Sequence, residues 1–140
     1  INMIKLIIGN KGAGKTKRLI DLVNSCVENS DGNIVCIEKE PKLTYDVSSK
    51  ARLLETETYA INGHKAFYGF LAGICAGNYD VTDILVDATF KIVGRDYKKL
   101  VQFFDMLSAL SEASDVDFYF TLSCDKEDLP VEIFDYCEEA

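Results

Sequence analysis

The sequence predicts an α/β fold: a three-layer αβα sandwich with a mainly parallel sheet. Segments with the features of strands alternate with segments of helical periodicity, which implies right-handed βαβ crossovers. The first strand candidate, residues 4–8, is an apolar run of the kind found in strands buried on both faces. The chain has 140 residues, 48% of them hydrophobic, and we find no linker or repeat. We therefore expect a single domain over residues 1–140, of minimal size but with a real core.

The individual elements follow from apolar spacing. Helices are expected where apolar residues recur every three or four positions, and strands where short apolar runs end at turn residues. On this basis we expect strands at residues 4–8, 33–38, 83–87 and 117–123, and helices at residues 15–28, 63–77, 97–113 and 130–138. The stretch 42–62 has no clear pattern beyond a short strand candidate at 51–54.

Turn and capping residues set the limits of these elements. The sequence Ser-Asp-Gly-Asn ends the first helix, and Pro41 stops the second strand. Asn62 is the expected cap of the helix at 63–77, and Gly77-Asn78 is its expected end. The helix at 97–113 has one apolar face, which consists of Leu100, Phe104, Leu107 and Leu110.

Charge and cysteine content exclude several classes of protein. The net charge of −8 argues against non-specific nucleic-acid binding, because an acidic surface repels a phosphate backbone; residues 11–18 are a local basic exception. No apolar run approaches the roughly 20 residues of a membrane span, so we expect no membrane insertion. The start of the chain has no signal-peptide pattern, and the five cysteines contain no Cys-x-x-Cys. We therefore expect a cytoplasmic protein with reduced core cysteines.

A glycine-rich loop follows the first strand. Gly9-Asn10-Lys11-Gly12-Ala13-Gly14-Lys15-Thr16 matches G-x-x-x-x-G-K-[ST] at every fixed position, the Walker A or P-loop motif. Glycines allow successive N–H groups to point inward and form an anion nest, and the following helix adds its positive dipole end. Lys15 is expected to reach the β- and γ-phosphates, and Thr16 to ligate Mg²⁺. The stretch therefore predicts a polyphosphate site, with residues 9–16 as its binding residues.

An acidic residue at the end of a later strand completes the pattern. Ile84-Leu85-Val86-Asp87 is an apolar strand that ends in an aspartate, as in a Walker B segment. Asp87 is therefore expected to hold the Mg²⁺ shell together with Thr16.

These two motifs resemble the P-loop NTPase superfamily, and the alternating strands and helices extend the resemblance over most of the chain. Within the superfamily, the sequence is similar to the RecA-like branch, which includes the thymidine kinases. RecA-like ATPases place a water-activating glutamate just after their second strand, so the resemblance implies Glu40, and then Glu38, as the catalytic base. Asp87-Ala88-Thr89-Phe90 and residues 121–130 also resemble thymidine-kinase segments, and the latter implies Ser123 or Cys124 near the γ-phosphate.

The sequence also departs from these relatives. Ala88 stands where thymidine kinases have a glutamate, and there is no zinc ribbon. Arg95 is a candidate γ-phosphate contact, and Arg18 or Arg52 could act across a subunit interface.

The sequence therefore predicts a Mg²⁺-dependent protein that binds ATP and ADP. The first hypothesis is a slow ATPase of RecA-like type, activated in a homo-oligomer or by a protein partner. Two alternatives remain open. The second hypothesis is a nucleotide-gated binding module with negligible hydrolysis, and the third is a nucleoside-type kinase.

Overall fold

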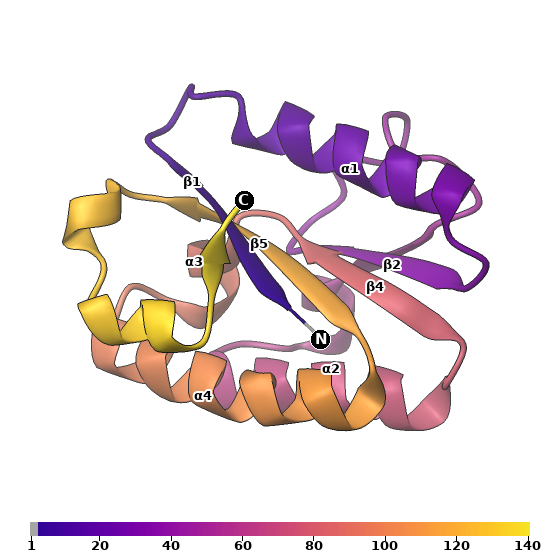
Figure 1. Cartoon of the computed structure of the whole chain (residues 1–140). Coiled ribbons are helices and arrows are strands. Elements are labelled where there is room, and N and C mark those ends of the chain that lie inside the picture. Colours follow the sequence, from indigo (N-terminus) through magenta and orange to yellow (C-terminus); the bar gives the residue numbers. More distant parts are fainter. Residues whose placement is uncertain (1–2) are drawn as a thin grey trace.

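A computed structural model describes residues 3–140 as a six-stranded sheet with helices on both faces (Figure 1). All the strand pairs are parallel, and the strand order is β3-β2-β4-β5-β1-β6. The strands are β1 (Ile4–Gly9), β2 (Asn33–Glu38), β3 (Arg52–Glu55), β4 (Val81–Val86), β5 (Asp117–Ser123) and β6 (Glu138–Glu139). The α-helices are α1 (Lys15–Asn29), α2 (His64–Gly77), α3 (Thr89–Val93) and α4 (Tyr97–Ser114). Short 3₁₀ helices occupy Thr56–Tyr59, Lys126–Asp128 and Val131–Asp135.

The two faces of the sheet bury two separate apolar clusters. On one face, α1 packs Leu19 and Val23 against sheet residues such as Ile7. On the other, α2 and α4 lie side by side under the sheet (Figure 1). There Phe120 of β5 meets Phe104 edge to face, with ring centroids 5.3 Å apart. The predicted three-layer α/β arrangement is therefore present.

The strand order brings the two sequence motifs to the same edge of the sheet. Because all the strands are parallel, their carboxyl ends lie together, and this is where ligands bind in open α/β sheets. The glycine-rich loop follows β1, and Asp87 follows β4. β5 lies between these two strands, so its carboxyl end is placed beside both motifs.

The carboxyl-terminal segment corrects one prediction. The expected helix at 130–138 is a 3₁₀ helix at Val131–Asp135, and the chain then forms β6. β6 pairs with β1 in parallel, and the Ala140 N–H donates to the Leu6 carbonyl at 2.8 Å. Without β6, the backbone N–H and C=O groups along the edge of β1 would have no strand to pair with. A helix over residues 130–138 could not supply these hydrogen bonds, because its backbone groups bond within the helix.

The start of α2 corrects another prediction. Its N-cap is Gly63 rather than Asn62, and no side chain caps the helix. Gly63 has φ of 87°, which favours glycine, and its N–H donates to the Ile92 carbonyl at 2.9 Å. The contact with α3, which the sequence did not predict, therefore sets the start of this helix.

Four of the five cysteines are buried, as expected for core residues, whereas Cys26 is partly exposed. All five cysteines are free, and burial raises the pKa of the Cys36 thiol to about 12, so this thiol is unreactive.

No helix within residues 3–140 is long and apolar enough to cross a membrane.

Candidate functional site

The glycine-rich loop has a backbone that side chains would disfavour. Gly12 and Gly14 have φ of 89° and 83°, in the left-handed region. A Cβ on Gly9 would lie 2.9 Å from the Cβ of Ala13, so the turn out of β1 is too tight for a side chain there. Gly14 is the N-cap of α1 and offers no side-chain cap. The first N–H groups of α1 are thus left for a ligand or for water, as in helix N-termini that bind anions.

The lysine of the motif lies over its own loop. The Lys15 ammonium donates to the Asn10 carbonyl at 3.0 Å. The Asn10 amide in turn donates to the Asp125 carboxylate at 2.6 Å, which fixes the loop to the segment after β5. Lys15 is therefore held at the mouth of the loop, where a bound anion would meet it.

Asp87 is the meeting point of three elements. The Thr16 hydroxyl of α1 lies 3.2 and 3.3 Å from its two carboxylate oxygens. From β5, the Thr121 hydroxyl donates to Asp87 Oδ1 at 2.8 Å and accepts from the Ala88 N–H at 2.7 Å. The Asp87 N–H donates to the Ile37 carbonyl of β2 at 2.9 Å. The carboxylate is thus fixed beside Thr16 by hydrogen bonds from both sides.

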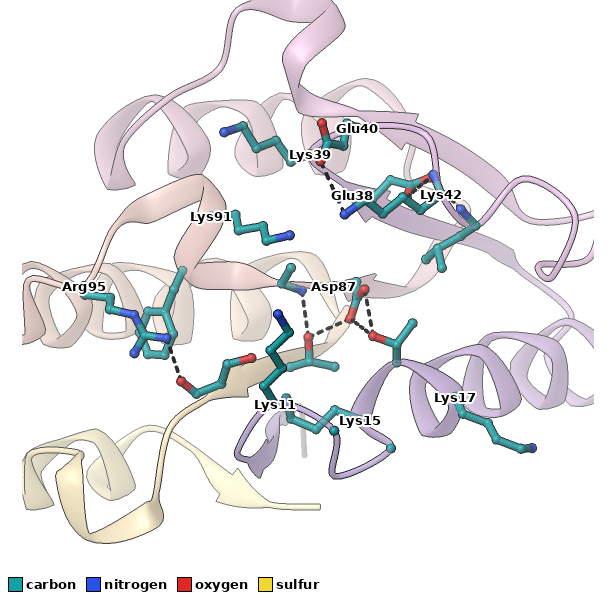
Figure 2. A pocket seen from close by; sticks show the side chains of 18 residues that line it. Lys11, Lys15, Lys17, Glu38, Lys39, Glu40, Lys42, Asp87, Lys91 and Arg95 are labelled. Atoms are coloured by element: carbon teal, nitrogen blue, oxygen red, sulfur yellow. Dashed lines mark hydrogen bonds and ion pairs between the residues drawn. The ribbon is translucent and has the colours of Figure 1, made fainter.

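A cavity of about 720 Å³ opens over these groups (Figure 2). This volume is in the range of small-molecule and cofactor sites. Seven of the 15 lysine and arginine residues of the chain line it, namely Lys11, Lys15, Lys17, Lys39, Lys42, Lys91 and Arg95. Its acidic lining residues are Glu38, Glu40 and Asp87. In a chain with a net charge of −8, this concentration of cations favours an anionic ligand.

The two candidate bases differ in their surroundings. Glu38 is buried, and its two carboxylate oxygens accept from the N–H groups of Lys42 and Leu43 at 2.9 and 3.3 Å. It therefore fixes the loop after β2. Glu40 lines the cavity and forms an ion pair with the Lys42 ammonium at 3.4 Å. The Glu40 carboxylate is thus the less constrained of the two.

Burial raises the pKa of Glu38, with Glu55 and Asp87 adding to the shift, although the two backbone hydrogen bonds oppose it. The folded protein therefore holds this proton to a higher pH than the unfolded chain. The contribution of the protonated Glu38 carboxyl to stability falls as the pH rises from about 4.5, the ordinary pKa of the group, through its raised pKa in the folded protein.

We expect Glu38→Gln to remove this pH dependence. Glutamine does not ionise, so the stability of the variant does not carry this contribution. As the pH rises through this window, the free energy of unfolding of the variant should increase relative to that of the native protein. Denaturant titrations of both proteins, over a pH series that starts below 4.5, measure the difference. Parallel pH profiles for the two proteins would contradict the prediction.

The remaining predicted residues are only partly brought together. Arg95 lines the cavity, donates to the Ser123 carbonyl at 2.8 Å and stacks over the Phe90 ring at 4.5 Å. Ser123 also lines the cavity, whereas Cys124 is buried and does not. Arg52 lies in a different cavity, formed around the amino-terminal ends of β2 and β3.

Sequence reasoning missed Thr121 and three lysines, Lys39, Lys42 and Lys91. Thr121 could have been noticed as a polar residue within the apolar strand sequence Asp-Phe-Tyr-Phe-Thr-Leu-Ser. The lysines carry no such signal, because they belong to no motif and lysines are common on surfaces.

No protein-family model matches the sequence, and no curated protein matches it significantly.

Proposed function

We propose that the protein is a Mg²⁺-dependent ATP-binding protein and a slow or partner-activated ATPase of RecA-like type. The observation that carries this proposal is the position of the Walker A hydroxyl of Thr16 against the Asp87 carboxylate, at 3.2 and 3.3 Å, beside a cavity rich in lysine. In P-loop NTPases these two residue types hold the Mg²⁺ that bridges the phosphates.

The residues at this position suit Mg²⁺. Thr16 and Asp87 supply oxygen donors, which this hard cation prefers. Within residues 3–140, no group of three or more His, Cys, Asp or Glu side chains is arranged to hold a metal ion. Mg²⁺ bound together with a nucleotide does not need such a group, because it retains waters and takes phosphate oxygens as ligands. With Mg²⁺ bound, the site would gain a charge that offsets that of the phosphates.

The roles of the other residues follow from their positions. The loop at residues 9–16 and the start of α1 would hold the phosphates, and Lys15 would leave the Asn10 carbonyl to contact them. Glu40 is the first candidate for activation of the attacking water, because both oxygens of Glu38 already accept backbone hydrogen bonds.

A second function, a nucleotide-gated module with negligible hydrolysis, is favoured by Ala88. This residue follows Asp87 directly, and a methyl group cannot accept a proton. Its backbone is left-handed, with φ of 51°, and is tied to the Thr121 hydroxyl. A module of this kind would bind ATP and ADP tightly and present a different surface in each state to a protein partner.

One experiment separates these functions. We expect calorimetric titration to give saturable binding of Mg-ATP and Mg-ADP that weakens when EDTA removes the metal. Recovery of ADP from the ATP titration would support the ATPase, whereas recovery of intact ATP would support the gated module. Absence of binding for both nucleotides, repeated in a second assay, would refute both.

A further inference from the structure

Two of the four cavity-lining lysines outside the loop at residues 9–16 are close enough to affect each other's charge. Lys42 belongs to the loop after β2, and Lys91 belongs to α3. Figure 2 shows both side chains directed into the cavity, across Asp87 from Lys11 and Lys15. We refer to Lys42 and Lys91 as the lysine pair.

The charges of the lysine pair are only partly balanced. A hydrogen bond between the two side chains, and then the charge of Lys42, lower the pKa of Lys91. The same hydrogen bond, and then Glu40, raise the pKa of Lys42. Glu40 pairs with Lys42 at 3.4 Å, so one carboxylate faces two ammonium groups. Two like charges repel at short range, and an anion between them would relieve this repulsion.

Three of the other five cations that line the cavity already have contacts, and Lys17 is one of them, since it pairs with Asp21 at 3.4 Å. Lys15 lies over its own loop, and Arg95 is tied to the Ser123 carbonyl and the Phe90 ring. Both lysines of the pair are exposed, so an anion from solution can reach them.

We propose that Lys42 and Lys91 form a second phosphate subsite, opposite the loop at residues 9–16 and separated from it by Asp87. The subsite takes one phosphate group. That group is either the terminal phosphate of a nucleotide held in the loop or the phosphate of a separate ligand. The first source rests on the proposed function; the second does not require it.

The test uses Lys91→Met and Lys42→Met, which keep the length of the side chain and remove its charge. Lys65→Met is the matched control, because Lys65 is an exposed lysine of α2 that does not line the cavity. Lys42→Met keeps the backbone N–H that donates a hydrogen bond to the Glu38 carboxylate. Circular dichroism checks that each variant is folded.

Calorimetry then measures the affinities of all four proteins for Mg-ATP, for Mg-ADP and for inorganic phosphate added to the Mg-ADP complex. If the terminal phosphate occupies the subsite, each lysine variant should lose about three- to fivefold in its preference for ATP over ADP. If a separate ligand occupies it, that preference should stay, and the affinity for added phosphate should fall by a similar factor. Both quantities unchanged in both variants would overturn the proposal.

Failure of the proposed function gives a different pattern. If the native protein binds no nucleotide, inorganic phosphate is titrated into the protein alone. The subsite stands if Lys91→Met and Lys42→Met weaken this binding and Lys65→Met does not. It falls if phosphate does not bind or if the variants bind it as the native protein does.

Discussion

Replacing Lys15 with alanine is expected to weaken Mg-ATP binding by roughly 10- to 150-fold, since a hydrogen bond to a charged group contributes about 1.5–3 kcal/mol. In the protein without ligand, the ammonium makes one hydrogen bond, to the Asn10 carbonyl. A phosphate in the loop would replace this neutral acceptor with a charged one. Removal of the ammonium therefore destabilises the complex with nucleotide more than the free protein. Any hydrolysis should fall with it. Calorimetry and a phosphate-release assay measure the two effects.

The control for this variant is Lys65→Ala. Lys65 is an exposed lysine of α2 outside the cavity, so its removal changes the net charge equally without touching the loop. We expect both variants to unfold at nearly the same denaturant concentration as the native protein, because surface substitutions change stability by about 0.5 kcal/mol or less. Native affinity for Mg-ATP in Lys15→Ala would mean that the loop does not bind the phosphates, and the proposed function would be wrong.

Replacing Thr121 with valine is expected to affect both stability and metal dependence. Valine has nearly the same shape and suits a strand, but it has no hydroxyl. Asp87 Oδ1 would lose the shorter of its two hydrogen bonds, and the Ala88 N–H would lose its acceptor. Leaving a donor such as this N–H unpaired costs about 1–3 kcal/mol. Because Thr121 orients the carboxylate expected to hold Mg²⁺, the Mg²⁺ concentration for half-maximal ATP binding should rise by roughly 10- to 100-fold. Denaturant unfolding and Mg²⁺ titrations at fixed ATP measure the two effects.

Thr121→Ser separates orientation of the carboxylate from packing. Serine keeps the hydroxyl and removes a buried methyl group, so it should keep the native Mg²⁺ dependence while losing about 1 kcal/mol of stability. If valine and serine destabilise the protein and both leave the Mg²⁺ dependence unchanged, Thr121 has a structural role alone.

Local sequence was sufficient to predict most of the elements of the sheet and its main helices. The strand at 33–38 was predicted with the limits that β2 has, and the helix at 63–77 differs from α2 by one residue. These elements bury regular apolar patterns, and such patterns are encoded in consecutive residues. The Walker A residues were also readable, because the turn needs glycines at fixed spacing: Gly12 and Gly14 have positive φ, and Gly9 has no room for a Cβ.

Only the tertiary structure decided how distant segments meet. β6 forms because the edge of β1 is available to pair with it, and nothing in the sequence Cys-Glu-Glu-Ala indicates a strand. Thr121 acquires its role because β5 lies between β1 and β4 and carries its hydroxyl to Asp87. The lysine pair likewise consists of one residue from the loop after β2 and one from α3, which are far apart in the sequence. The sequence by itself determined most of the elements and the glycine-rich loop. The strand order determined which side chains face that loop, because contacts between residues far apart in the chain depend on topology and not on local spacing.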